Sequence, residues 1–165
     1  MSLRAAMVDY LAADAGISAI VGARVFDRFL SLQDLGNVDA TAAAGLPAVV
    51  VALVSQDYDG DVTDGKLTRD NTTLEVSCIG AVNPTRLYAP SPAVRASEVA
   101  ALRTIDALSE AVKSALVALY PLIPATPPAG MSDVLAFAIE SMGEEEEDTG
   151  QRETLIKTVF TVTLG

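Results

Sequence analysis

The sequence contains no histidine and no tryptophan, and its only cysteine is Cys78. Without histidine, the chain lacks the side chain whose ordinary pKa suits a general base near neutral pH, and it lacks the commonest transition-metal ligand. Serine–histidine and cysteine–histidine catalytic sites and histidine-containing zinc sites are therefore excluded. A single thiol cannot form an internal disulfide or a paired-cysteine metal site, which is consistent with a reducing compartment.

Basic residues are also scarce, and the acidic residues are unevenly placed. The chain has 22 Asp and Glu against 11 Lys and Arg, for a net charge of -11. Ten of the acidic residues fall into two segments that hold no basic residue: Asp57, Asp59, Asp61 and Asp64, and then Glu140, Glu144, Glu145, Glu146, Glu147 and Asp148. Because a phosphate-binding surface needs clustered Lys and Arg, this distribution argues against nucleic-acid recognition.

Long apolar runs are missing as well. The uncharged windows Ala40–Gln56 and Ser114–Ser132 are interrupted by glycine or proline, so neither predicts a transmembrane helix of about 20 residues. The first residues include Asp9 and Asp14 and lack a basic start followed by an unbroken apolar stretch, so we expect no signal peptide. We therefore expect no membrane partner.

The chain does contain enough apolar material for one core. Half of its 165 residues are hydrophobic, and we expect a single domain over residues 1–165. Ser2 predicts the N-cap of a first helix that ends at Gly16. A short strand at Val25–Phe29 is expected next. The stretch Leu30–Gly45 has no clear periodicity and predicts a long loop.

The middle of the chain predicts a hairpin and then a long helix. Ala48–Val54 is apolar and rich in β-branched residues, and apolar residues alternate with polar ones along Thr72–Val82, so we expect two paired strands around a polar tip at Asp57–Asn71. Ser91 predicts the N-cap of an amphipathic helix that ends at Pro121. Its apolar stripe consists of Leu102, Ile105, Leu108, Val112, Leu116 and Leu119.

The end of the chain predicts a second hairpin. Apolar residues alternate with small ones in Leu135–Ile139 and with polar ones in Glu153–Leu164, and the intervening Gly143–Gly150 carries the Glu run at an expected tip. Local hairpins separated by a helix indicate an α+β fold. We expect a largely antiparallel sheet of about four to five strands, with an N-terminal helix and one long amphipathic helix packed on it.

One segment resembles the beginning of a calcium-binding loop. Asp57, Asp59 and Asp61 alternate as such a loop requires, since alternating carboxylates can surround a hard cation. The position that should be glycine is Val62, however, and the position that should be glutamate is Thr68. These three aspartates are therefore weak metal candidates, and an exposed polar hairpin tip is the favoured interpretation.

Other patterns predict no chemistry. Cys78 lies in an alternating strand and is interpreted as a small core residue. No catalytic or cofactor-binding pattern is present, so we expect the chain not to be an enzyme and to use no cofactor. Adjacent carboxylates repel one another and prefer water, so the acidic segments are either solvated turns or docking surfaces. The interface candidates are Asp57, Asp59, Asp61, Asp64, Glu144, Glu145, Glu146, Glu147 and Asp148.

The order of these segments resembles the tail terminator, or tail completion, proteins of long-tailed bacteriophages and related tail-like particles. The resemblance is carried by Leu11–Gly22 at the end of the first helix, by Ala23–Phe26 directly after it, and by the Leu46–Val51 strand. It continues in the long Ala-rich helix from Glu98 onward and in the final strand rich in Thr and Val. It covers nearly the whole chain.

The resemblance implies a structural role. Subunits are expected to form a homo-oligomer, a hexameric ring that caps the head-proximal end of the tail tube. The tail tube protein and the head-closure or connector protein are the expected partners, and DNA passes through the lumen without sequence recognition. The expected location is the neck region of the virion, after synthesis in the host cytoplasm.

Three alternatives stay open at this point. The first is a head-closure or neck adaptor protein of the same particle, and the second is a calcium-dependent binding module that uses Asp57, Asp59 and Asp61. The third, an enzyme that uses carboxylates, has the least support from the residues.

Overall fold

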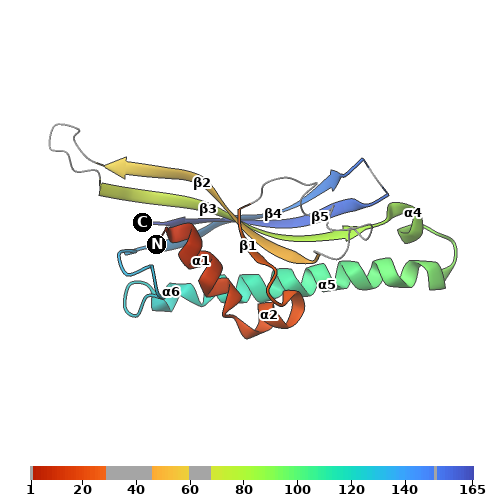
Figure 1. The fold of residues 1–165 in the computed structure, drawn as a ribbon, viewed down its shortest axis with the longest axis horizontal. Helices are drawn as coiled ribbons and strands as arrows, with labels where there is room; N and C mark the ends of the chain where they lie inside the picture. Colours follow the sequence, from red (N-terminus) through yellow and green to blue (C-terminus); the bar gives the residue numbers. More distant parts are fainter. Residues whose placement is uncertain (1, 29–45, 60–67, 151) are drawn as a thin grey trace.

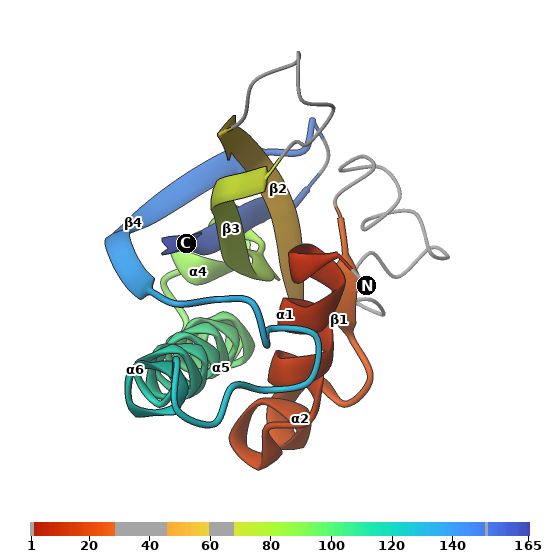
Figure 2. The ribbon, with the colours of Figure 1, turned by 90° about the vertical axis from the view of Figure 1, so that its left-hand side faces the viewer.

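The computed structural model describes residues 2–28, 46–59, 68–150 and 152–165. Within these ranges, five strands form one sheet in the order β1-β2-β3-β5-β4, and helices cover one of its faces (Figure 1, Figure 2). The strands are β1 Val25–Asp27, β2 Ala48–Asp59, β3 Thr68–Val82, β4 Phe137–Asp148 and β5 Thr154–Leu164. The helices are α1 Leu3–Ala12, α2 Ala15–Val21, α4 Pro84–Leu87, α5 Pro92–Val117 and α6 Leu119–Leu122.

The sheet is antiparallel except at one edge. There β1 pairs in parallel with only the Val49–Val51 stretch of β2. The pairs β2–β3, β3–β5 and β5–β4 are all antiparallel. The expected α+β class is confirmed, with its largely antiparallel sheet, N-terminal helix and long helix. Because β5 runs opposite to β3, the β2–β3 and β4–β5 hairpins turn at opposite ends of the long molecule (Figure 1).

The main core lies between the sheet and the helices. Leu74, Val76 and Cys78 of β3 are fully buried, which confirms the alternation predicted for this strand. The α5 stripe is buried from Ile105 onward, and its other buried residues are Leu108, Val112, Ala115 and Leu116. A smaller cluster of Val50, Ile79 and Leu155 is separate from this core. Both faces of the first half of β2 therefore carry buried residues.

Two helix ends differ from the sequence prediction. Ser2 does cap α1, where its Oγ accepts a hydrogen bond from the Ala5 N–H at 3.2 Å. Gly16 does not end this helix, because α1 has already ended at Ala12 and Gly16 lies inside α2. The Asp14 carboxylate accepts from the Ile17 N–H at 2.9 Å, so it starts a new helix just before the glycine.

The long helix also ends earlier than predicted. α5 stops at Val117, and Pro121 lies in the short helix α6. A proline is tolerated there because the first N–H groups of a helix have no intrahelical acceptor. Ser91 occupies the N-cap position of α5, but its side chain makes no capping hydrogen bond. Pro92 then provides the expected first helical residue.

The strand ends differ from the prediction in both directions. β2 continues to Asp59 and β3 begins at Thr68, so part of the expected polar tip belongs to the ladder. β1 ends at Asp27, and Leu135 lies before β4 with 72% of its surface exposed. The expected loop Leu30–Gly45 lies outside the described residues. No described helix is long and apolar enough to cross a membrane.

Candidate assembly surfaces

β4 is an edge strand, and its outer side is only partly covered. Near its start, the Ile139 N–H donates a hydrogen bond to the Tyr120 hydroxyl at 2.9 Å, and the Tyr120 ring packs edge-on against Phe137 with centroids 5.1 Å apart. Beyond this point, no described strand pairs with the outer side of β4. An open edge of this length presents unpaired backbone groups that a neighbouring chain can bind.

The Glu run lies in this edge strand, so its prediction as a hairpin tip is wrong. Glu144 to Asp148 pair with Thr158 to Thr154 of β5, so β4 continues through the whole Glu run to Asp148. In a strand, successive side chains point to opposite faces, which halves the number of carboxylates that share a face.

A lysine on the neighbouring strand also offsets the repulsion. The Lys157 ammonium lies 2.6 Å from the Glu147 carboxylate, and only 15% of the lysine side chain is exposed. Glu145 lies directly opposite Lys157 in the register. Opposite charges across a strand pair stabilise it, so Lys157 holds the acidic half of β4 in the sheet. The same charges keep two copies of this half-strand from pairing with each other.

A second surface is formed by the outer part of the β2–β3 hairpin, here called the arm (Leu53–Asp59 and Thr68–Thr72). Val54 and Tyr58 are 53% and 57% exposed, and Asp57 beside them is exposed as well. The register shifts after Leu53 and again after Gln56, which indicates two irregularities close together in β2. Such bulges bend a strand and increase its twist, so the arm turns away from the plane of the sheet.

Two of the weak metal candidates lie in this arm. Asp57 and Asp59 are residues of β2, whereas Asp61 and Asp64 lie outside the described residues. Among the residues that the structure describes, no group of three or more His, Cys, Asp or Glu side chains could hold a metal ion. The calcium site as a set of three aspartates therefore stays a prediction.

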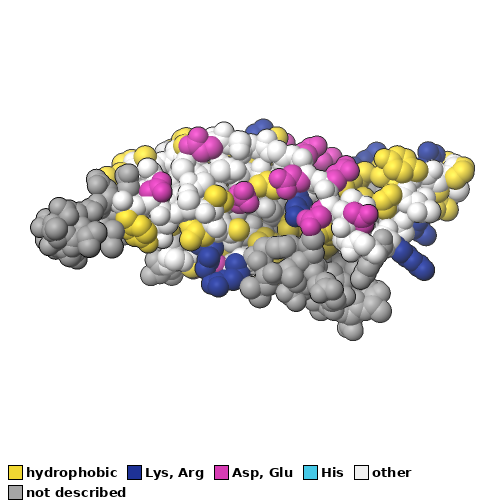
Figure 3. Space-filling model, turned by 90° about the horizontal axis from the view of Figure 1, so that it is seen from above, with side chains coloured by type: hydrophobic (Ala, Val, Ile, Leu, Met, Phe, Trp, Pro, Cys, Tyr) yellow, Lys and Arg dark blue, Asp and Glu magenta, His cyan; other side chains and the backbone are white. Residues whose placement is uncertain are grey.

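The opposite end of the molecule carries an apolar groove of about 780 Å³, here called the end groove. α4 and the first half of α5 line it with Leu87, Tyr88, Pro92, Ala96, Val99 and Ala100. Arg95 and Arg103 are the charged residues among the described residues that line it. Figure 3 shows hydrophobic side chains together with Lys and Arg at this end, and acidic side chains over the middle of the sheet.

The first half of α5 has no buried residue. Burial in this helix begins at Ile105, its fourteenth residue, although Val94, Val99 and Leu102 before it are apolar and half-buried. Most of the stability of a protein helix comes from packing of its apolar side, so an unburied half-helix is a surface suited to a partner. Glu98 on this half-helix is already engaged, because it accepts from the Asn83 N–H at 2.9 Å and pairs with Arg86 at 3.4 Å.

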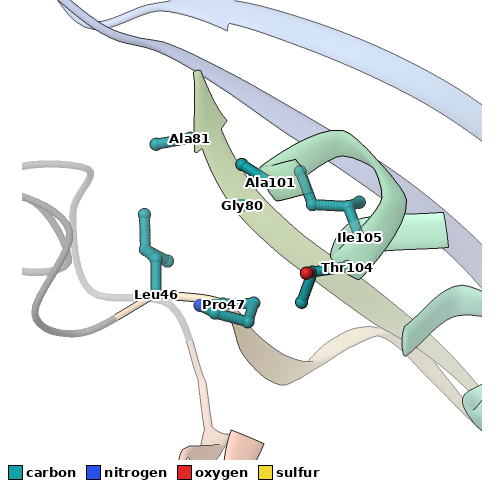
Figure 4. Close-up of a pocket in the computed structure, with 7 residues that line it drawn as sticks. All are labelled: Leu46, Pro47, Gly80, Ala81, Ala101, Thr104 and Ile105. Carbon is teal, nitrogen blue, oxygen red and sulfur yellow. The ribbon is translucent and has the colours of Figure 1, made fainter. Parts of the chain in front are cut away.

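Where α5 does pack on the sheet, the contact is close. Ile105 lies directly over Gly80 of β3 beside an apolar pocket of about 160 Å³, which Leu46 and Pro47 also line (Figure 4). A Cβ atom on residue 80 would be 2.3 Å from both Cγ1 and Cδ1 of Ile105. Glycine is therefore required here for the helix to approach the strand.

Buried titratable groups contribute to the core and not to these surfaces. Burial raises the pKa of the Cys78 thiol to about 12, against a smaller lowering by a hydrogen bond with Ser109. The expectation that Cys78 is a core residue is confirmed, since its surface is fully buried. Burial, and secondarily the Asp14 charge, raises the pKa of Tyr10, whose hydroxyl donates to the Ala115 carbonyl at 2.6 Å.

The structure separates the acidic segments and adds a surface that the sequence argument missed. The described parts of the two segments lie toward opposite ends of the sheet and do not form one site. The end groove was not predicted. Its sequence signal was present, because the apolar stripe of the long helix begins only at Leu102, ten residues after the helix starts. No protein-family model matches this chain, and no curated protein matches it.

Proposed function

We propose that this chain is a structural subunit of a tail terminator ring, which caps the head-proximal end of a tail tube and joins it to the head connector. One observation carries the proposal. Among the described strands, both edges of the sheet have backbone groups that no strand pairs with. At one edge these groups lie on the outer side of β4, and at the other they lie on β2 beyond Val51. A closed ring needs two such different surfaces on each subunit.

The charge distribution supports a role around DNA without recognition of DNA. Acidic side chains lie over the sheet face in Figure 3, and the chain carries a net charge of -11. A surface of this sign repels the phosphate backbone, so DNA moves past it without adhering. In this proposal the acidic face lines the lumen, and the expected location is the neck of the virion.

The tail tube protein and the connector are the proposed partners on the two rims of the ring. All subunits of a closed ring point the same way along its axis, so the two rims present different surfaces to the proteins above and below. A head-closure or neck adaptor would use the same features on the neighbouring ring of the particle, and only its position distinguishes it.

Imaging tests this proposal directly. The purified chain, alone and mixed with the tail tube protein encoded with it, is examined by negative-stain electron microscopy. We expect rings with a central hole that bind one end of each tube and stop its growth. A chain that forms no ring and leaves tube length unchanged contradicts the terminator role. Binding to isolated connectors without any effect on tubes indicates the neck adaptor instead.

A further inference from the structure

We infer that the arm of one copy of this chain docks into the end groove of a second copy. This contact deepens the self-association on which the proposed function rests, because it names the two surfaces that meet. It uses side chains of the arm and of α4 and α5, whereas pairing between the strand edges would use the backbone of β4 and of β2 beyond Val51.

The apolar parts of the two surfaces match. The end groove is lined by half-buried and exposed apolar residues of α4 and of the first half of α5, which has no fully buried residue. The arm exposes Val54 and Tyr58. Tyrosine is enriched at the centres of protein interfaces, since it buries a large ring and keeps one polar group for a hydrogen bond. Docking would remove both apolar surfaces from water.

The charges also match. Arg95 and Arg103 are the charged residues of the groove, and Asp57 is the exposed charge beside Tyr58 in the arm. A guanidinium can bind a carboxylate through two parallel hydrogen bonds and can also stack on an aromatic ring. The arm therefore offers an acidic and an aromatic group to a groove that accepts both. The chain has 11 basic residues against 22 acidic ones, yet the described lining of this groove contains two arginines and no Asp or Glu.

The geometry makes the contact intermolecular. The arm and the end groove lie at opposite ends of the long axis (Figure 1), so a subunit cannot fill its own groove. Two different surfaces of one chain then join head to tail, and such a contact continues from copy to copy until a ring closes or a filament grows. The acidic half of β4 is a poorer occupant, because Glu144–Asp148 contains no apolar residue to fill the groove.

Two complementary variants test the inference. The arm variant carries Asp57→Lys and Tyr58→Ser, and the groove variant carries Arg95→Glu and Arg103→Glu. A matched charge reversal outside the groove, Lys113→Glu on the exposed side of α5, serves as the control. Sedimentation velocity measures the size of each species, and far-UV circular dichroism confirms that each variant is folded. Each variant should weaken self-association about tenfold or more, as loss of central interface residues commonly does.

The mixture of the two variants gives the sharper result. The groove variant keeps an intact arm and the arm variant keeps an intact groove, so an equimolar mixture should form a 1:1 dimer and stop there. The dimer should dissociate as salt is raised, because the Debye length falls from about 8 Å at 0.15 M to about 3 Å at 1 M. Rings that persist in both variants leave the terminator proposal standing and overturn the arm–groove contact. A mixture that stays monomeric also overturns the contact, as does a control variant whose self-association is as weak as that of the two test variants. If the mixture forms a 1:1 dimer but the wild-type chain never caps tubes, the contact is supported and the terminator role is contradicted.

Discussion

Replacing Gly80 with alanine tests how closely α5 is seated on the sheet. The new Cβ would lie 2.3 Å from two atoms of Ile105, whereas ordinary contacts begin at 3.4 Å. The isoleucine must therefore move by about 1 Å or change rotamer, and in a helix a β-branched side chain has one strongly preferred rotamer. Overpacking of this kind costs about 1–3 kcal/mol.

Two effects reduce this cost. Alanine loses less backbone freedom than glycine on folding, which offsets about 0.4–1 kcal/mol. The pocket of about 160 Å³ beside Ile105 also gives the side chain space to shift. We expect Gly80→Ala to lower the free energy of unfolding by about 1–2 kcal/mol, and at about 2–4 °C per kcal/mol this lowers the Tm by several degrees.

Urea denaturation followed by circular dichroism, at one fixed protein concentration, measures the effect. Gly143→Ala is the matched control, since a Cβ on that strand glycine meets no atom within 4 Å and its variant should be more stable than the wild type by about 0.4–1 kcal/mol. Ile105→Ala removes both clashing atoms and alone costs about 2–5 kcal/mol. In that background Gly80→Ala should cost nothing further. An equal cost of Gly80→Ala in both backgrounds would refute the steric account.

Three further predictions concern single side chains. The Thr72 hydroxyl is buried and has no hydrogen-bond partner among the described residues, so Thr72→Val should raise the free energy of unfolding by about 1 kcal/mol in the same urea assay. Glu147→Gln weakens the pair with Lys157 and should lower the free energy of unfolding by about 0.2–1 kcal/mol. The control Glu146→Gln should leave the free energy of unfolding unchanged or raise it, and equal effects of the two variants would contradict the role of Lys157. The pKa of Cys78 is raised from 9.0 to about 12 in the folded state, so the stability that the buried neutral thiol contributes is fully present below about pH 9 and is lost as pH rises toward 12. The free energy of unfolding of Cys78→Ala should therefore fall less than that of the wild type across this pH interval.

The fold class could be predicted from sequence because the strongest patterns report burial. The alternation at Leu74, Val76 and Cys78 and the stripe from Ile105 onward both mark side chains that face one core. Element ends were less predictable. Gly16 and Pro121 are residues that usually end helices, but Asp14 caps a new helix before the glycine, and the proline lies in the first turn of α6. These outcomes depend on neighbouring caps and not on the residue alone.

The candidate surfaces were predictable only in part. The sequence identified Glu144–Asp148 as a distinct acidic segment but placed it at a turn, because its pairing depends on Lys157 ten residues beyond Glu147. The end groove could not be assembled from sequence, since Tyr88 and Arg103 line one groove only when α4 folds back beside α5. The unburied first half of α5 was the local feature that pointed toward it.

The opposed hairpins also determine how a subunit carries mechanical load. β3 is hydrogen-bonded to β2 on one side and to β5 on the other along most of its length. The bonds of an antiparallel ladder run perpendicular to the strands. A pull applied between the arm and the end groove acts along β3, whose backbone runs without a break from Thr68 in the arm to Val82, just before α4. The covalent backbone of β3 therefore carries the load, and the ladders on its two sides are not pulled apart. A pull that separated the two strands of one hairpin would instead break their hydrogen bonds one after another. A subunit gripped at its two ends therefore resists stretching without losing its sheet.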